Sequence, residues 1–362
     1  MKQIKVDLKE NNYQIVIGKH SVAKLADKIN SLPITKCLLI IDKNVEKYHS
    51  KKLRIAFANV DCKISKYVFT ATEKNKKINN AEKIFKYLSD NYFDRNSVIV
   101  GVGGGITGDM TGFVASTFMR GINYFNVPTT LLAMVDSSIG GKTGVNFETR
   151  KNLIGTFYQP SGVYVDDVFL NTLPKKEITS GSGEIFKYAF LADEKNYKLL
   201  KNRLKKILTD SLNNYETVVQ NCLKIKSYVV SKDEKEKTGL RKILNLGHTF
   251  AHAYEIVSNY QIRHGEAVFG GIFSALFASE KLGYLSNLKL NQYLSDFSFI
   301  KLNKKFRLLD DEKVYKVMMA DKKNLAGKIN LVLIEDIGRI IIDAPASKAD
   351  ILYGNRKMKS LI

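Results

Sequence analysis

The first half of the chain alternates short apolar runs with stretches of helical periodicity. The apolar runs are rich in Val, Ile, Leu and Tyr, which is typical of β-strands. We expect strands at Gln3–Leu8, Tyr13–Ile17, Cys37–Ile41, Ser65–Val68, Ser97–Val102 and Tyr124–Val127. Helical periods fall at Ser21–Asn30 and Asn80–Asn91. This alternation predicts an α/β domain with a largely parallel sheet.

The pattern changes at about Pro174 to long helical periods, with few strand signals before Ile329–Leu333. The uncharged run Ala267–Ser279 is too short to span a bilayer and predicts a buried helix. We therefore expect two domains, an α/β domain at residues 1–175 and a mostly α-helical domain at residues 176–362.

Composition limits the classes of partner. The net charge of +21 comes mostly from Lys on helix-like stretches such as Lys195–Lys206, which favours a solvated surface. Basic and aromatic residues are not interleaved as in nucleic-acid-binding proteins, so we expect neither nucleic acid nor membrane as a partner. The cysteines are Cys37, Cys62 and Cys222, too few and too far apart for a disulfide framework. With no signal-peptide pattern at Met1, we expect a cytoplasmic protein.

A glycine-rich turn follows the strand-like run Ser97–Val102. Gly103, Gly105 and Gly108 satisfy G-x-G-x-x-G ahead of the helix-like Met110–Thr117. Such glycines allow positive φ and close approach of a pyrophosphate to a helix N-terminus, although a purely structural strand-to-helix turn is the alternative. The next strand ends near Asn126 rather than at an acidic residue. Asp42, with Asn44 beside it, is therefore the better candidate for ribose hydroxyls.

A dense polar segment runs from Pro128 to Gly144 and contains paired Thr and Ser residues, Asp136 and Lys142. Its hydroxyl and ammonium groups are the donors that phosphate oxygens require, although a solvated loop is the alternative.

Three of the five histidines, His248, His252 and His264, cluster in one short stretch. The four-residue spacing of His248 and His252 favours these two as metal ligands on one helix face. His264 is a possible third ligand and Glu184 a possible carboxylate ligand. Three protein ligands with an open position would form a catalytic metal site.

Taken in order, these motifs resemble those of the 3-dehydroquinate synthase family of sugar phosphate cyclases. The matching stretches cover most of the chain from Asp42 to about Asn324, and the most specific are Gly103–Asp109, Pro128–Asn146, Lys151–Phe157, Gly183–Lys187, Leu244–His252 and His264–Val268. Between the motifs, Asp233–Arg241 is one residue longer than usual, which makes the position of Lys226 less certain.

The resemblance implies a Rossmann-like NAD-binding domain, a helical domain that binds metal and substrate, and a homodimer. It implies Zn²⁺ or Co²⁺ bound by Glu184, His248 and His264, with His252 facing the substrate instead. NAD would contact Asp42, Asn44, Glu73, Lys76, Gly104, Gly105, Ile106, Thr107, Gly108, Asp109, Thr129, Thr130, Lys142, Lys151, Phe169, Leu170, Asn171 and Thr172. The catalytic and substrate set would be Asp136, Lys142, Asn152, Lys187, Lys226, Arg241, Asn245, His252 and Lys322 (or its neighbour Lys323), with Arg120 reaching across the dimer.

The implied reaction converts 3-deoxy-D-arabino-heptulosonate 7-phosphate, a small anionic sugar-acid phosphate, to 3-dehydroquinate and phosphate in the shikimate pathway. NAD would be reduced transiently, phosphate eliminated, the hydride returned and the ring closed by an aldol step. Three alternatives remain at this point: another sugar phosphate cyclase, an NAD- and metal-dependent polyol dehydrogenase, and a basic nucleic-acid-binding protein. The last would account for the charge but not for the His and Glu cluster.

Overall fold

The computed structural model describes residues 1–8, 11–148, 150–320 and 329–362. Their contacts divide the chain into two compact units. The first unit comprises residues 1–177 and 214–235, and the second comprises residues 178–213 and 236–362. The sequence pattern placed residues 214–235 in the helical second domain, whereas their contacts lie in the first unit.

A seven-stranded sheet forms the centre of the first unit, in the order β1-β2-β9-β6-β5-β3-β4. All neighbouring strands are parallel except β1 and β2. The bounds are β1 Lys2–Val6, β2 Tyr13–Ile17, β3 Lys36–Asp42, β4 Lys63–Phe69, β5 Val98–Gly103, β6 Asn123–Pro128 and β9 Gly162–Val165. These strands confirm the predicted α/β class with a largely parallel sheet.

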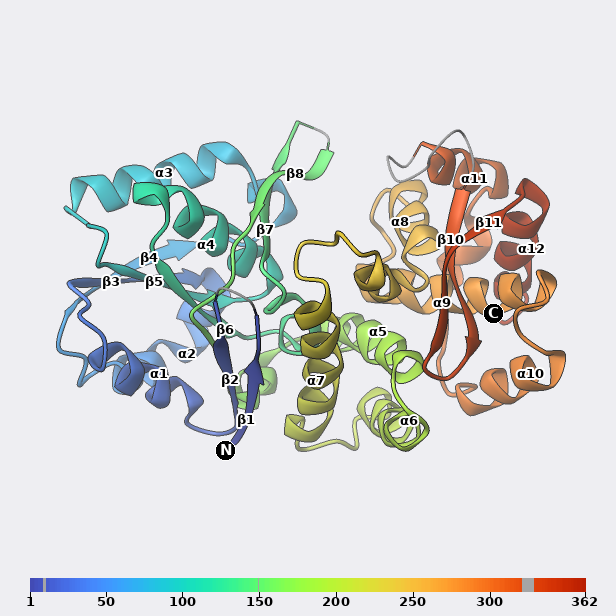
Figure 1. The fold of residues 1–362 in the computed structure, drawn as a ribbon, viewed down its shortest axis with the longest axis horizontal. Helices are drawn as coiled ribbons and strands as arrows, with labels where there is room; N and C mark the ends of the chain where they lie inside the picture. Colours follow the sequence, from blue (N-terminus) through green and yellow to red (C-terminus); the bar gives the residue numbers. More distant parts are fainter. Residues whose placement is uncertain (9–10, 149, 321–328) are drawn as a thin grey trace. The chain divides into compact units, whose positions relative to one another are not determined.

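Helices cover both faces of this sheet, with α1 and α2 on one side and α3 and α4 on the other (Figure 1). Their bounds are α1 Ser21–Asn30, α2 Lys43–Ala56, α3 Ile78–Asp90 and α4 Gly105–Thr117. In α1 the residues Val22, Leu25, Ala26 and Ile29 are buried, which is the spacing of one helix face. The strand β3, between β5 and β4, is buried from Cys37 to Asp42, as expected for a strand covered on both faces.

Short elements in the connections between strands and helices complete the first unit. These are the 3₁₀ helices η1 Glu73–Asn75, η2 Phe118–Arg120 and η4 Asp167–Thr172, the π-helical segment η3 Ala133–Ser137, and an antiparallel hairpin of β7 Lys142–Phe147 and β8 Arg150–Phe157. The polar pattern of residues 142–157 did not predict strands, because β8 is largely exposed and lacks an alternating apolar face.

The helix α7 Glu216–Lys232 also belongs to the first unit. Lys2 Nζ donates to the Thr217 hydroxyl over 3.1 Å, and the Tyr215 amide donates to the Asp167 carboxylate over 3.0 Å. Both bonds join segments more than 40 residues apart, so local periodicity alone could not place this helix.

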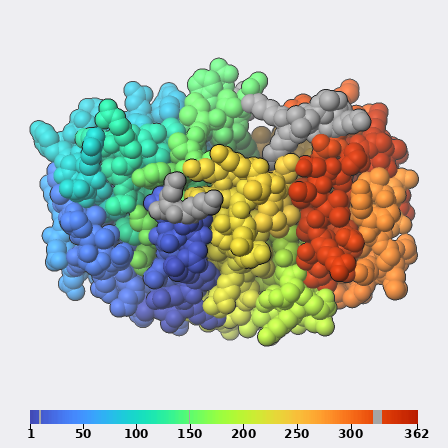
Figure 2. Space-filling model, in the orientation of Figure 1, coloured from blue at the N-terminus to red at the C-terminus, as the bar shows by residue number. Residues whose placement is uncertain are grey.

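The second unit is mostly helical, as predicted. It contains most of α5 Lys175–Leu191, then α6 Glu194–Leu208, η5 Leu240–Asn245, α8 His248–Val257, α9 His264–Lys281, α10 Asn287–Asp296, η6 Lys304–Leu308, α11 Asp311–Met319 and α12 Lys348–Lys359. The strand predicted at Ile329–Leu333 is β10 Ile329–Asp336, which pairs with β11 Arg339–Ala346. Figure 2 shows side chains of β11, in red, on the surface of this unit.

Two close approaches fix the second unit around α9. Aromatic side chains pack against this helix, with the ring of Phe186 on α5 5.3 Å from the ring of Phe273 on α9. The same two helices also meet backbone to backbone, because a Cβ at Gly183 would lie 2.2 Å from the Gly265 carbonyl oxygen. None of the helices in the described ranges is long and apolar enough to cross a membrane.

Replacing Gly183 by Ala should destabilise the second unit, because the added methyl group meets backbone that cannot rotate away. We expect a loss of about 1–3 kcal/mol or more in the free energy of unfolding, measured with denaturant. Gly108→Ala in α4 is the matched control, since a Cβ there has only an ordinary contact of 3.6 Å with Asn126. Equal stabilities of the two variants would contradict the close approach.

Candidate functional site

Most of the residues expected to hold a nucleotide lie at the carboxyl edge of the parallel sheet. The register pairs Ile41 with Val102, so Asp42 at the end of β3 lies beside Gly103 at the end of β5. The Thr129 amide, after β6, donates to the Gly103 carbonyl over 2.9 Å. Ligands of open α/β sheets bind at this edge, which makes it the candidate nucleotide site.

The glycine turn is shaped by close packing rather than by unusual backbone angles. Gly104 has φ −76° and ψ −172°, and none of the turn's glycines has positive φ. The expectation of left-handed glycines is therefore wrong. A Cβ at Gly103 would meet the Thr107 hydroxyl at 2.4 Å, and one at Gly105 would meet the Ser137 hydroxyl at 2.8 Å. Only glycine allows the strand, the helix and η3 to lie this close.

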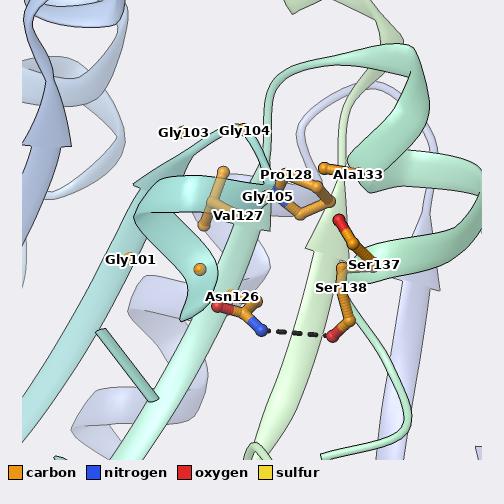
Figure 3. Close-up of a pocket in the computed structure, with 11 residues that line it drawn as sticks. Gly101, Gly103, Gly104, Gly105, Asn126, Val127, Pro128, Ala133, Ser137 and Ser138 are labelled. Atoms are coloured by element: carbon orange, nitrogen blue, oxygen red, sulfur yellow. Dashed lines mark hydrogen bonds between the residues drawn. The ribbon is translucent and has the colours of Figure 1, made fainter. Parts of the chain in front are cut away.

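A small cavity of about 10 Å³ lies beneath this turn, lined by glycines and by Asn126, Ser137 and Ser138 (Figure 3). Asn126 Nδ2 donates to the Ser138 carbonyl over 3.1 Å. Within the described residues the Asn126 Oδ1 and both serine hydroxyls lack a hydrogen-bond partner. The cavity has the size of one water molecule, so it is too small to hold a nucleotide.

Some expected nucleotide residues have side chains turned into the protein. Thr107 is fully buried, and Phe169 and Leu170 on η4 are buried as well. Thr172 is exposed and bonds the His49 ring over 2.7 Å, and that ring meets Phe169 edge-on at 4.9 Å. His49 was missed by the sequence analysis, because a lone histidine within α2 carries no motif.

Asp42 caps α2 by accepting from the Asn44 amide over 2.8 Å.

The loop that contains Glu73 and Lys76 is joined to the α4 turn and to β8. Lys76 is buried, and its ammonium group contacts both the Asp109 carboxylate and the Asn152 side-chain oxygen. Burial raises the pKa of Asp109, and the neighbouring Lys76 offsets part of that rise. Lys76 and Asp109, both expected to bind the nucleotide, thus form a single cluster with Asn152, which is expected to bind the substrate.

The expected substrate residue Asp136, on η3, pairs with Lys226 of α7. Lys226 Nζ lies 3.1 Å from the Asp136 carboxylate and donates to the Asp136 carbonyl over 2.9 Å. Although the spacing around residues 233–241 left Lys226 uncertain, the fold brings it to another expected substrate residue. Lys142 and Lys151 are exposed on the β7–β8 hairpin, and Arg120 ends η2 with φ 68°.

In the second unit, Glu184, His248 and His264 form the candidate metal centre. One ligand atom from each lies within 4.8 Å of the others, and no further group of this kind occurs among the described residues. The Nε2 atoms of His248 and His264 lie 3.3 and 3.1 Å from Glu184 Oε1. Three nitrogen and oxygen atoms converging on one point suit Zn²⁺ or a similar ion.

The other nitrogen of each histidine is fixed from behind. His248 Nδ1 lies 3.1 Å from the Leu246 carbonyl, and His264 Nδ1 lies 3.3 Å from Glu255 Oε2. Such outer bonds orient metal-binding imidazoles. Sequence analysis missed Glu255 as this support, although the residue stands near the histidines in sequence.

Charge balance in this cluster is set by burial and by close partners. Burial opposes ionisation of Glu184, but Lys187 and His248 lower its pKa well below the usual range. Burial also opposes the charged form of His264, yet its bonds to Glu184 and Glu255 raise its pKa to about 10. A metal ion bound at His264 Nε2 would take the place of that proton.

The spacing argument for His248 and His252 as the ligand pair is wrong for this fold. The three-residue group contains Glu184 and His264 with His248, and not His252. The His252 ring lies 5.6 Å from that of His248 and 6.4 Å from that of His264, so it stands beside the group.

The remaining expected substrate residues of the second unit are Lys187, Arg241 and Asn245. Lys187 is almost fully buried against Glu184. Arg241 is buried on η5, with its Nε 3.6 Å from Glu236. Lys322 and Lys323 lie outside the described residues.

Known proteins match this chain over both of its halves. Two family models match, 3-dehydroquinate synthase N-terminal over residues 66–180 and 3-dehydroquinate synthase C-terminal over residues 181–324. A 3-dehydroquinate synthase of Pelagibacter ubique is 43% identical over 346 residues, which cover 93% of each chain.

Solved structures share the fold over nearly the whole chain. A 2-deoxy-scyllo-inosose synthase complexed with carbaglucose-6-phosphate, NAD⁺ and Co²⁺ superposes with a TM-score of 0.87, at 23% identity over 98% of this chain and 99% of that one. A 2-epi-5-epi-valiolone synthase from Streptomyces hygroscopicus, with NAD⁺ and Zn²⁺ bound, also gives 0.87, at 24% identity over 98% of both chains. On the strength of the two family models and the 43% identity, the chain belongs to the 3-dehydroquinate synthase family.

Proposed function

We propose that this protein converts 3-deoxy-D-arabino-heptulosonate 7-phosphate to 3-dehydroquinate and phosphate. The observation that carries the proposal is the converging group of Glu184, His248 and His264 with Lys187 buried beside it. A relative with 43% identity over 93% of both chains bears the name of this activity, which supports the same reaction here.

NAD is the proposed redox cofactor, and when bound it supplies a hydride acceptor that can later return the hydride. We assign Asp42, at the end of β3, to the ribose, and the Gly104–Gly105 turn at the N-terminus of α4 to the phosphate groups. Thr129, Thr130 and the exposed Thr172 add hydroxyl donors along the same edge of the sheet. Lys76 and Asp109 would complete the pocket through the ion pair that they already form.

Zn²⁺ or Co²⁺ is the proposed metal, held by Glu184, His248 and His264, and when bound it supplies a Lewis acid for a substrate hydroxyl. The donor set fits such an ion: two imidazole Nε2 atoms face one carboxylate oxygen, and both imidazoles are held at Nδ1. His252 lies next to the group but not in it, and we assign it to the substrate.

The substrate carries a carboxylate and a phosphate, and the protein offers matching cations. We assign Lys142, Lys187, Lys226 and Arg241 to these groups. Lys226 and Lys187 are buried beside Asp136 and Glu184, so their ammonium groups are held in place before substrate arrives. Asn152 and Asn245 would contribute amide hydrogen bonds.

Two other activities fit parts of the site less well. An NAD- and metal-dependent polyol dehydrogenase needs no set of buried cations for a doubly anionic substrate. A cyclase for a different sugar phosphate would use the same groups, but the solved cyclases of that kind are only 23% and 24% identical to this chain.

We further propose a cytoplasmic homodimer in which Arg120 reaches the partner subunit. Arg120 follows Met119 in a left-handed stretch, with φ 68° and 51°, that ends at Gly121. Met119 is 46% exposed, so the turn presents an apolar side chain beside the guanidinium.

The metal assignment predicts that His264→Ala loses the ion and the activity while the fold remains. Glu255→Gln should weaken metal affinity by about 10- to 100-fold, because it removes the carboxylate behind His264. His252→Ala is the control and should keep its metal. Metal content of the purified proteins and circular dichroism test these outcomes, and full occupancy in His264→Ala would refute the ligand set.

The nucleotide assignment predicts weaker NAD binding by Gly104→Val. A Cβ added at Gly104 would lie 3.0 Å from the Thr130 methyl group. The larger, branched side chain of Val would therefore occupy the turn that we assign to the pyrophosphate. We expect the NAD dissociation constant to rise at least about tenfold in calorimetry. Unchanged affinity would mean that the turn is only structural.

The reaction predicts one phosphate released per substrate with no accumulation of NADH, because the hydride returns to the substrate. Absorbance of reduced nicotinamide should stay flat while phosphate rises, and NAD⁺ far below the substrate concentration should support complete conversion. If NADH forms in proportion to product, this proposal is wrong and the protein is a polyol dehydrogenase. Product analysis separates 3-dehydroquinate from the products of other cyclases.

A further inference from the structure

Asn146, near the end of β7, is a buried asparagine with no ligand role in the proposal above. Its side-chain Nδ2 donates to Glu73 Oε1 over 2.7 Å, and its Oδ1 accepts from the Asn152 amide over 2.9 Å. Its backbone amide donates to the Lys76 carbonyl over 2.7 Å. One residue thus binds both ends of the Glu73–Lys76 loop and the start of β8.

On the nucleotide side, Asn146 holds a loop with little regular structure of its own. The loop has only the three-residue η1, and Glu73 and Lys74 are exposed. Asn146 Nδ2 reaches both the Glu73 carboxylate and, over 3.3 Å, the Glu73 carbonyl. These bonds fix the direction of the Glu73 side chain in a loop that packing alone would leave free.

On the substrate side, Asn146 holds Asn152 in a conformation that most residues avoid. Asn152 has φ 50°, in the left-handed region, where an asparagine fits better than most residues but still at a cost. The bond from its amide to Asn146 Oδ1 favours this conformation. The Asn152 side-chain oxygen then faces Lys76, which donates to it.

Lys76 closes the network, because its ammonium group also contacts Asp109 at the glycine turn. Its carbonyl accepts from Asn146, so the same residue that fixes the Lys76 backbone also fixes the partner of its side chain. Four segments (the loop, the α4 turn, β7 and β8) therefore meet at two buried side chains.

We propose that Asn146 is a positioning residue that sets Glu73 and Lys76 for the nucleotide and Asn152 for the substrate at the same time. The nature of the two ligands rests on the proposed function. Asn146 acts through its neighbours, since its own polar atoms are already bonded to Glu73 and Asn152.

The first test separates the two sides of the network. Asn146→Asp keeps an acceptor for the Asn152 amide but puts a carboxylate against Glu73. The NAD dissociation constant should rise about tenfold or more, while the KM for substrate changes far less. In a Glu73→Gln protein, the new amide group can donate to the carboxylate that Asn146→Asp introduces. In that background, adding Asn146→Asp should therefore raise the NAD dissociation constant by less than about threefold. An equal loss in both backgrounds would overturn the contact as the cause.

The second test does not depend on either ligand. In Asn146→Ala, hydrogen exchange of the free protein should accelerate at residues 73–76 and at the Asn152 amide. Thr156→Val is the matched control, because it removes the 2.8 Å hydroxyl contact with Thr143 in the same hairpin but leaves the network intact. It should lose stability without faster exchange at residues 73–76. Unchanged exchange in Asn146→Ala would overturn the proposal, whereas absence of phosphate release by the wild type would refute only the proposed function.

Discussion

The backbone contact between α5 and α9 is the constraint on which the metal group depends. Gly183 and Gly265 bring the two helices so close that a methyl group on either glycine would overlap the backbone of the other helix. Each glycine directly precedes or follows a proposed ligand, since Glu184 follows Gly183 and His264 precedes Gly265. The 3.1 Å distance between those two side chains is therefore set by the helices and not by the side chains themselves.

The close helices bury the Glu184 carboxylate, so its negative charge must be balanced by neighbouring residues. A carboxylate as buried as Glu184 is costly unless opposite charge lies next to it. Lys187, one turn further along α5, lies against the Glu184 carboxylate, and the raised pKa of His264 places a second positive charge there, which a metal ion can replace. Glu255 holds the outer nitrogen of His264. The cluster is thus arranged before a ligand binds, which suits a site that must stabilise charge during reaction.

Sequence patterns predicted what is local and missed what depends on distant partners. The strand Tyr13–Ile17 and the helix Ser21–Asn30 agree with the structure to the residue, because their buried positions follow the periods of strand and helix. Spacing alone selected His248 with His252, since helical periodicity carries no information about Glu184 or His264 on other helices. The glycine turn was located correctly, but its glycines serve close packing. The β7–β8 hairpin and the contacts of Asn146 left no periodic signal, because both depend on cross-strand and loop contacts. Most of the individual substrate and nucleotide roles remain predictions.

Because α7 belongs to the first unit but follows residues 178–213 of the second unit in the sequence, the first unit cannot finish folding early in synthesis. During synthesis the sheet strands are complete once β9 has emerged, but Asp136 still lacks its partner Lys226, which is encoded about 90 residues later in the chain. The helix that carries Lys226 must also find β1, at the opposite end of the sequence of this unit. The first unit therefore closes only after residues 178–213 of the second unit have been made. The two units are thus interleaved in the sequence, and a cut at residue 177 would separate Lys226 from the aspartate with which it pairs.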